Sequence, residues 1–208
     1  MEKIGAIILA AGNSARLGQA KQLLLFRGQT LLRRGIAAAR GANCSPIAVV
    51  IGAERDRIVS ELAGEKVLLV ENPNWQRGIG NSIRTGLRES LAAYPNLDAV
   101  ILLACDQPLV DRETIIGLKT KREETKKPIV ASRYANTLGI PALFARGYFD
   151  ELFALEDEAG AKGIIVDHLE DVAEFPFPKG AIDIDTADDY ERLVRQCEQS
   201  AATEKSAE

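Results

Sequence analysis

A short segment near the N-terminus combines residue types that suit the binding of phosphate groups. The small residues Ala10-Ala11-Gly12 let backbone N–H groups approach a ligand closely. Arg16 and Lys21 follow within nine residues of Gly12 and bring positive charge. The apolar run at 4–9 predicts a buried parallel strand just before them. A strand that leads into a glycine turn followed by cations is suited to binding a polyphosphate. The alternative is that the segment is only a glycine-rich turn whose Arg and Lys are solvated.

The spacing of this segment excludes two common nucleotide-binding loops. A Walker A loop reads G-x-x-x-x-G-K-[ST], whereas Gly12 and Gly18 enclose five residues here and Lys21 is not adjacent to Gly18. The dinucleotide fingerprint G-x-G-x-x-G is absent as well, because Gly12 is followed by Asn13-Ser14-Ala15. The segment therefore predicts a phosphate loop of another kind.

Two aspartates further along the chain are candidates for binding a cation. Asp106 follows the apolar run at 99–103, and open α/β sheets bind ligands outside the carboxyl ends of their strands. Asp185 stands just before a predicted helix, outside the capping-box-like pair Thr186 and Asp189. Mg²⁺ binds through one or two carboxylates together with phosphate oxygens and water. The alternatives are that Asp106 only makes an Asx-turn and that Asp185 is a surface carboxylate.

The spacing A-A-G-x-S-x-R-x-G-x-x-K at 10–21 resembles the signature loop of the MobA-like nucleotidyltransferases. The paired Ala10-Ala11 and the run Lys21-Gln22-Leu23-Leu24 bring it closest to the molybdenum cofactor cytidylyltransferases. The resemblance covers about residues 4–195. Four further motifs follow in order, namely N-W-Q-R-G-I-G-N-S-I at 74–83, C-D-Q-P at 105–108, G-I-P-A-L-F at 139–144 and D-I-D-T at 183–186.

The resemblance implies transfer of CMP from CTP to molybdenum-bound molybdopterin, with release of pyrophosphate and with Mg²⁺ as cofactor. A phosphomonoester acceptor is already dianionic near neutral pH, so the reaction needs positioning and charge neutralisation and no general base. We expect the amides after Ala11-Gly12, with Arg16, to hold the β- and γ-phosphates and Lys21 to contact the α-phosphate. A handover contact with a molybdoenzyme or its chaperone would suit so fragile a product.

Site residues are carried over from the resemblance motif by motif. It assigns catalysis to Lys21, Arg16 and Asp106, and the metal to Asp106 and Asp185. The implied nucleotide-binding residues are Ala10, Ala11, Gly12, Asn13, Ser14, Arg16, Lys21, Gly78, Gly80, Asn81 and Ser82. Trp75 is expected to lie in the core or in the wall of the cleft.

The acceptor side departs from the family pattern. Many relatives have a polar residue in place of Ile140. On the base side, relatives more often carry Met and Ser where Ile79 and Asn81 stand, and the alternative there is a capped helix start without a ligand. The segment 157–162 reads D-E-A-G-A-K where relatives often show G-D-x-G-A-R, although it still predicts a helix N-terminus at Gly160. Another phosphorylated acceptor, such as a sugar or alcohol phosphate, and a non-catalytic nucleotide-binding or cofactor-carrier module therefore remain as alternatives.

Strand and helix patterns alternate along the chain and predict a single-domain, Rossmann-like α/β fold. The expected form is a three-layer sandwich around a mostly parallel sheet, which the resemblance makes similar to nucleotide-diphospho-sugar transferases. One domain is expected over 1–198, followed by a polar tail at 199–208. Strands are predicted at 4–9, 47–51, 67–70, 99–103, 128–131, 141–144 and 172–175. Helices are predicted from Thr30 to Gly41, through Ile58 and Leu62, over 79–93, from Asp111 through Leu118, over 160–169 and over 187–197.

Composition narrows the classes of partner. A net charge of -4 over 208 residues argues against non-specific binding to nucleic acid or anionic membrane. No apolar run approaches the roughly 20 residues that span a bilayer, and no signal-peptide pattern opens the chain. Cys44, Cys105 and Cys197 lack metal-ligand or redox spacing, which favours free thiols and a cytoplasmic location. The single histidine, His168, is expected at a surface or a helix end and not in catalysis.

Overall fold

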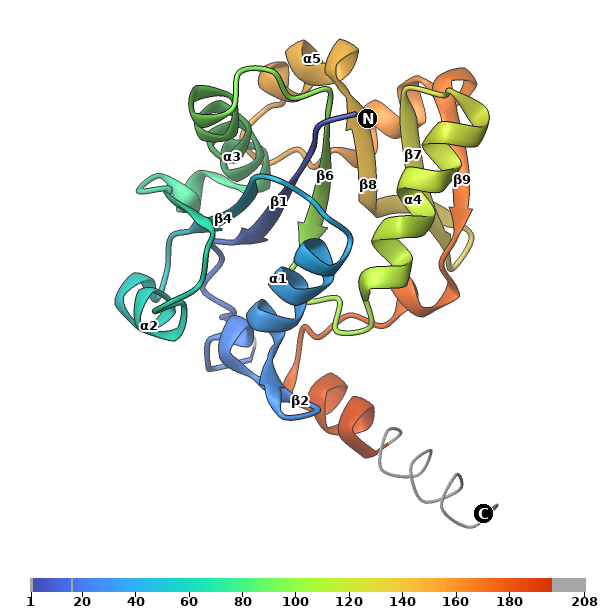
Figure 1. Cartoon of the computed structure of the whole chain (residues 1–208). Coiled ribbons are helices and arrows are strands. Elements are labelled where there is room, and N and C mark those ends of the chain that lie inside the picture. The colour runs from blue at the N-terminus through green and yellow to red at the C-terminus, as the bar shows by residue number, and fades with distance from the viewer. Residues whose placement is uncertain (1, 16, 196–208) are drawn as a thin grey trace.

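The structure is a computed structural model that describes residues 2–15 and 17–195 (Figure 1). Arg16, Cys197 and the predicted tail at 199–208 lie outside the described residues. The main sheet consists of β1 (Ile4–Ala10), β4 (Ile47–Ile51), β5 (Leu68–Glu71), β6 (Ala99–Ala104), β7 (Ile129–Tyr134), β8 (Thr137–Ala145) and β9 (Val172–Pro176). The helices are α1 (Leu31–Gly41), α2 (Arg55–Glu61), α3 (Ile79–Ala93), α4 (Arg112–Thr125), α5 (Phe149–Ala154), α6 (Lys162–Asp167) and a C-terminal helix described over 187–195.

The main sheet has the strand order β5-β4-β1-β6-β8-β7-β9. β8 runs antiparallel to both of its neighbours, β6 and β7, and the other pairings in this sheet are parallel. β1 lies near the middle, paired with β4 on one side and β6 on the other. The prediction of a mostly parallel central sheet is therefore confirmed.

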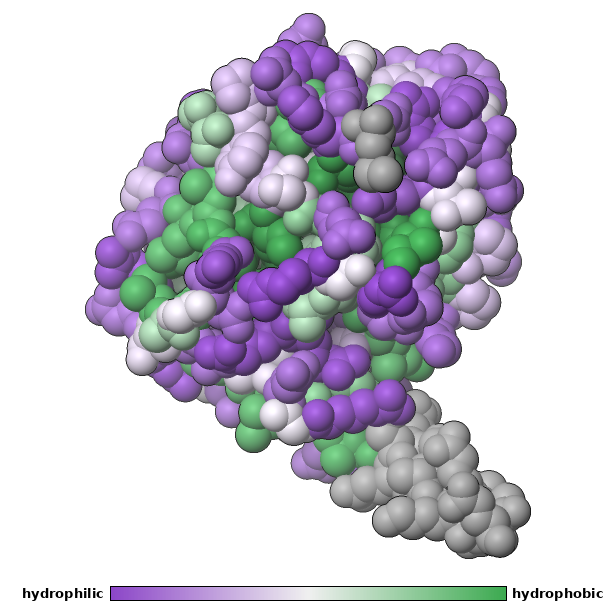
Figure 2. Space-filling model, viewed as in Figure 1, coloured by the Kyte–Doolittle hydropathy of each residue, from purple (hydrophilic) through white to green (hydrophobic). Residues whose placement is uncertain are grey.

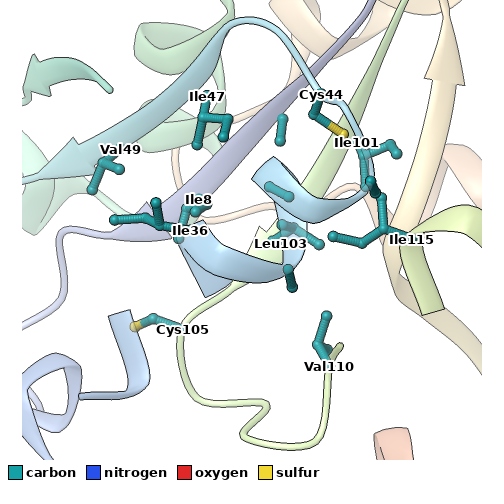
Figure 3. Packing of buried hydrophobic residues seen from close by; sticks show 14 of the residues in the cluster. Ile8, Ile36, Cys44, Ile47, Val49, Ile101, Leu103, Cys105, Val110 and Ile115 are labelled. Atoms are coloured by element: carbon teal, nitrogen blue, oxygen red, sulfur yellow. The ribbon is translucent and has the colours of Figure 1, made fainter. Parts of the chain in front are cut away.

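Helices cover both faces of the sheet and make it the middle of three layers (Figure 1). Ile8 of β1 packs in the apolar cluster that contains Ile36 of α1 and Ile115 of α4. The preceding residue, Ile7, belongs to a second cluster, which contains Ile83 of α3. Figure 3 shows Ile36 and Ile115 reaching the sheet around Ile8 and its neighbours. Because successive side chains of a strand point to opposite faces, an apolar run without alternation can fill both layers.

Two helix starts follow from their first residues. Thr30 precedes α1, and its side chain accepts a hydrogen bond from the backbone N–H of Arg33 at 3.2 Å. Asp111 precedes α4 and accepts from the backbone N–H of Thr114 at 2.8 Å. Each cap satisfies one of the N–H groups that a helix leaves without an internal partner. Both predicted caps are confirmed.

The helix predicted over 160–169 is shorter in the structure. α6 spans Lys162–Asp167, and a separate 3-10 turn follows at Leu169–Asp171. The prediction that a helix begins at Gly160 was wrong. The helical backbone ends at His168, whose φ of -126° and ψ of 41° lie outside the helical region, and Gly160 lies before the N-cap residue Ala161.

Sequence reasoning missed a small hairpin and a helix. Strands β2 (Leu25–Phe26) and β3 (Gln29–Thr30) pair antiparallel across Arg27-Gly28, which both have positive φ angles. Two positive φ angles are the mark of a tight type I′ turn, for which the glycine was a readable signal. α5 is only six residues long and follows a 3-10 turn, so its pattern is too short for periodicity to identify.

No helix among the described residues combines the length and the apolar character needed to cross a membrane. The face seen in Figure 2 is mostly hydrophilic, with apolar residues showing in smaller groups between polar side chains. Cys44 and Cys105 are buried thiols without a disulfide.

Candidate functional site

A cavity of about 340 Å³ lies at the carboxyl ends of β1 and β6. β1 stands between β4 and β6, so the chain leaves it first to one side and later returns to the other. The crevice beside such a reversal is where open α/β sheets bind their ligands. The cavity is lined by Leu9, Ala11, Gly12, Ser14, Lys21, Gln22, Trp75, Gln76, Gly78, Ile79, Ser82, Ala104, Cys105 and Asp106.

The loop after β1 is held by hydrogen bonds from residues that follow it. Ser14, which adopts a positive φ, accepts a hydrogen bond through its hydroxyl from the backbone N–H of Lys21 at 3.0 Å. The Nε2 group of Gln22 donates to the carbonyl oxygens of Ala10 at 2.8 Å and Gly12 at 2.7 Å. The sequence showed Gln22 only as part of a motif. Gln22 stands between Lys21 and the run Leu23-Leu24-Leu25, and nothing in that pattern indicated which groups its amide would meet.

Lys21 joins the loop to two carboxylates from distant parts of the chain. Its Nζ lies 3.2 Å from Oδ2 of Asp106 and 3.0 Å from Oδ1 of Asp185. The side chain of Lys21 is only 15% exposed, so solvent screens these ion pairs weakly. The structure thus brings together three of the residues that the sequence assigned to catalysis and metal binding.

Asp185 reaches Lys21 because the residues on either side of it are fixed. The backbone N–H of Ile184, which is fully buried, donates to the carbonyl oxygen of Asp106 at 3.0 Å. Thr186 and Asp189 then cap the C-terminal helix reciprocally: the N–H of Thr186 donates to the Asp189 carboxylate at 2.9 Å, and the N–H of Asp189 donates to the Thr186 hydroxyl at 3.2 Å. This is the predicted capping box, and it leaves the Asp185 side chain on the Lys21 ammonium.

Charge and burial set the protonation states around Lys21. Burial alone would lower the pKa of the Lys21 ammonium, but Asp106 and Asp185 outweigh it, so that this pKa is raised. Burial raises the pKa of the Asp183 carboxyl, and the nearby charges of Asp106 and Asp185 add to the effect. Burial and Asp106 together raise the pKa of the Cys105 thiol to about 12, so Cys105 is no nucleophile at neutral pH.

Among residues 2–15 and 17–195, no group of three or more His, Cys, Asp or Glu side chains is arranged to hold a metal ion. Asp106 and Asp185 do converge on one cationic atom, Nζ of Lys21. Two carboxylates are enough for Mg²⁺ when phosphate oxygens and water complete its coordination. The donor set therefore fits a divalent cation that arrives with a phosphorylated ligand.

The opposite wall of the cavity is formed by the segment around Gly78. Gly78 has a φ of +130°, and a Cβ atom there would lie 2.8 Å from Cα of Glu158. A Cβ on Gly80 would lie 2.8 Å from the carbonyl oxygen of Ala159 and closer still to that of Glu156. Both glycines are thus required by close packing against the segment at 156–159. The sequence reading had ascribed them to close approach of a nucleotide.

Asp157 ties that segment to the start of α3. Its carbonyl oxygen accepts from the backbone N–H groups of Gly80 at 2.8 Å and Asn81 at 3.3 Å. Its carboxylate pairs with Arg77 at 2.6 Å and with Arg84. These cations, Arg84 first, lower the pKa of the Asp157 carboxyl. The charges of this group satisfy one another and do not line the cavity.

The predicted nucleotide-binding residues divide into two sets. Those that line the cavity are Ala11, Gly12, Ser14, Lys21, Gly78 and Ser82. Ala10, Asn13, Gly80 and Asn81 do not line it, and Arg16 lies outside the described residues. Trp75 lies on the cavity wall, packed so closely on Gly52 that a Cβ there would meet its ring.

The acceptor-side motif lies beside Asp106. Nε2 of Gln107 and the hydroxyl of Tyr134 both donate to the carbonyl oxygen of Ile140 at 3.0 Å. His168 lies elsewhere, 2.7 Å from a carboxylate oxygen of Glu151. It caps the C-terminal end of α6, and the expectation of a position at a surface or a helix end is confirmed in that respect.

Comparisons with known proteins identify the family of this chain. The family model described as MobA-like NTP transferase domain matches residues 6–172. The chain is 32% identical over 126 residues to the bifunctional protein GlmU of Sorangium cellulosum, covering 55% of this chain and 25% of that protein. It is 26% identical over 146 residues to the nicotine blue oxidoreductase of Paenarthrobacter nicotinovorans, covering 70% of this chain and 68% of that protein. The chain thus spans about a quarter of the GlmU protein that it matches.

Solved structures share the whole fold. Rv0371c from Mycobacterium tuberculosis H37Rv has a TM-score of 0.80 at 29% identity, covering 93% of this chain and 98% of that chain. Rv0371c in complex with manganese has a TM-score of 0.74 at 27% identity, over 93% and 98% of the two chains. Molybdopterin-guanine dinucleotide biosynthesis protein A from Archaeoglobus fulgidus has a TM-score of 0.65 at 16% identity, over 94% and 99% of the two chains, which shows a shared fold alone.

Proposed function

The chain belongs to the MobA-like NTP transferase domain family, and on that premise we propose that it transfers CMP from CTP to a phosphorylated acceptor and releases pyrophosphate. The favoured acceptor is molybdenum-bound molybdopterin. The observation that carries the proposal is the meeting of Lys21, Asp106 and Asp185 beside the glycine loop. A cytoplasmic site of action and transient contact with a molybdoenzyme or its chaperone belong to the same proposal.

The chain's own residues supply positioning and charge. The loop at 11–14 offers backbone N–H groups and a hydroxyl on the cavity wall, where the phosphates of an NTP would lie. Lys21 exchanges its carboxylate partners for phosphate oxygens and neutralises charge that develops at the α-phosphate. A phosphate acceptor is its own nucleophile, and the buried, protonated thiol of Cys105 takes no part.

Asp106 and Asp185 would hold a divalent cation, Mg²⁺ in our proposal, once the Lys21 ammonium turns to phosphate. When bound, the metal would supply further charge neutralisation on the phosphate oxygens. The manganese complex of Rv0371c is support from a relative with the same fold. The apolar surface of Trp75 and the backbone at Gly78 are left to face the nucleoside.

The test is pyrophosphate release by the purified protein with Mg²⁺, molybdopterin loaded with molybdate, and CTP, GTP, ATP or UTP in separate reactions. We expect turnover with CTP. Turnover with another nucleotide alone would overturn the choice of CTP and keep the reaction type. Binding of CTP by calorimetry without turnover would point to another acceptor, such as a sugar or alcohol phosphate.

A non-catalytic module predicts binding of nucleotide or cofactor without pyrophosphate release for any acceptor. The relative named nicotine blue oxidoreductase carries a different activity in its name, so the assay needs this outcome as well. Against it stands the meeting of Asp106 and Asp185 on the ammonium of Lys21, beside the cavity. If the protein neither binds nor turns over any NTP, the proposal is wrong.

A further inference from the structure

Gln22 is a buried polar residue for which the proposed reaction has no use as a ligand or base. Its side chain follows Lys21 in the 3-10 turn Lys21–Leu23, and the residue is only 1% exposed. Within the described part of the chain, its Oε1 atom meets no hydrogen-bond donor. Burying an oxygen without a donor costs free energy that an apolar residue of the same size would avoid. The reason for an amide here must therefore lie in the bonds that Nε2 makes.

The Nε2 group of Gln22 is hydrogen-bonded to the glycine loop. Nε2 donates to the carbonyl oxygens of Ala10 and Gly12 at 2.8 and 2.7 Å. The orientation of the amide is fixed by these two bonds, because only the NH₂ group can donate to two carbonyls. Between them, the carbonyl oxygen of Ala11 accepts from the backbone N–H of Ala53 at 2.9 Å. Three successive carbonyls are therefore anchored inside the protein.

Anchoring a carbonyl also directs the N–H group of the same peptide unit. The peptide is planar and trans, so the N–H of Gly12 points away from the Ala11 oxygen and the N–H of Asn13 points away from the Gly12 oxygen. Ala11 and Gly12 line the cavity. We infer that Gln22 is a positioning residue that presents the backbone N–H groups of this loop to the phosphates of the nucleotide, an inference that rests on the proposed function.

The first test compares Gln22→Met with the wild type by two measurements. Amide hydrogen exchange over residues 10–15 needs no ligand, and we expect it to be at least about tenfold faster in Gln22→Met. Calorimetric binding of CTP with Mg²⁺ should weaken about 10- to 100-fold, since the loop N–H groups are no longer held toward the charged phosphates. Ser90→Ala is the control, because Ser90 is equally buried and donates to a carbonyl oxygen at 2.7 Å within α3. Ser90→Ala should leave both loop exchange and CTP affinity unchanged.

A second variant, Gln22→Glu, adds a readout that a merely structural role would not move. A protonated carboxyl can donate one hydrogen bond to the loop carbonyls, whereas the ionised form repels both. Burial against carbonyl oxygens favours the neutral form. CTP affinity relative to the wild type should therefore be partly restored at low pH and lost as the pH rises, a dependence absent from Gln22→Met.

The outcomes separate this inference from the proposed function. Unchanged loop exchange in a folded Gln22→Met variant would overturn the positioning role. Faster exchange with unchanged CTP affinity would overturn the link to phosphate. If the wild type binds no NTP, the proposed function fails, while hydrogen exchange still decides whether Gln22 orders the loop. If Gln22→Met does not fold, the pH dependence of Gln22→Glu decides.

Discussion

The two walls of the cavity use charged residues in opposite ways. On the wall formed by the loop after β1 and by the end of β6, Lys21 and Asp106 line the cavity and pair with each other. On the wall formed by 75–82, the charges belong to Arg77, Arg84 and Asp157, which pair outside the lining. A charge in the sequence therefore does not mark a functional group by itself. What matters is whether the partners of the charged group leave it facing a ligand.

The contacts that hold the two walls also differ in reach. The hydroxyl of Ser14 and the amide of Gln22 bond to residues that are 7 to 12 positions away in sequence. The Asp157 side chain bonds to residues that are 73 to 80 positions away. The loop wall is therefore held in part by contacts within its own segment, together with the bond from the N–H of Ala53 to the carbonyl oxygen of Ala11. The second wall depends wholly on two segments that only the folded chain brings together.

The largest effect is expected at Lys21, because it is a cation that lines the cavity, whereas Arg77 and Arg84 of the second wall do not. We expect Lys21→Met to lower kcat for pyrophosphate release about 10²- to 10³-fold, because a cation at the reacting phosphate is lost. Binding of Mn²⁺ without nucleotide should tighten, since Asp106 and Asp185 lose the ammonium that now neutralises them. Lys119→Met is the control, because Lys119 donates to the carbonyl oxygen of Ala42 away from the cavity. A kcat within about threefold of the wild type in Lys21→Met would contradict the assigned role.

The next effect tests whether Asp106 and Asp185 act as a pair on one cation. Asp106→Asn and Asp185→Asn should each lower the rate about 10²-fold at fixed Mg²⁺, since metal catalysis contributes several kcal/mol. Higher Mg²⁺ should recover part of that loss, measured as a titration of the initial rate. Asp188→Asn removes an exposed charge three residues from Asp185 and should leave the Mg²⁺ dependence unchanged. An equal Mg²⁺ requirement in all variants would argue against a metal at these carboxylates.

The second wall is tested by adding a methyl group where α3 lies closest to the segment at 156–159. Gly80→Ala forces a methyl group against the carbonyl oxygens of Glu156 and Ala159 and should cost about 1–3 kcal/mol of stability. We expect KM for CTP to rise more than kcat falls, because the wall shifts while the charged groups stay in place. Gly163→Ala is the matched control in α6, where no atom lies within 4 Å of the added Cβ. Equal melting temperatures for the two variants would show that the close approach is tolerated.

The smallest effect concerns the pH dependence of stability at the second wall. The arginines lower the pKa of Asp157 in the folded protein, so its contribution is present above the unfolded pKa of about 3.9 and is lost as the pH falls through the folded value. Wild type should therefore melt higher than Asp157→Asn at neutral pH, and the difference should shrink below about pH 4. Asp188→Asn, at an exposed position, controls for removal of one negative charge. A difference that stays constant with pH would exclude the ion pairs as its source.

Sequence reasoning was most successful where the signal lay within a few residues. The boundaries predicted for the strand at 47–51 and the helix at 79–93 are those of the structure, because continuous burial and helical periodicity are local patterns. The capping box at Thr186 and Asp189 was readable for the same reason. The β2–β3 hairpin was missed, although Gly28 marked its turn.

In the candidate site, too, the residues with a local sequence signal were predicted and the contacts between distant segments were not. Lys21, Asp106 and Asp185 were identifiable from residue type, position after a strand and motif. Gly78 and Gly80 were also identified, but their close packing against the segment at 156–159 was not foreseen, and their predicted approach to a nucleotide stays a prediction. The role of Gln22 was invisible in sequence, since it depends on which carbonyls its amide meets.

The sequence by itself determined the layered α/β fold, the glycine loop and the residue types that make a phosphate and cation site possible. Periodicity, small residues after a strand and helix caps act over a few residues and do not require the rest of the chain. Only the tertiary structure decided that Lys21 meets Asp106 and Asp185, and that Asp157 holds the second wall. Those contacts join residues that are 73 to 164 positions apart, and their geometry is set by packing across the whole sheet.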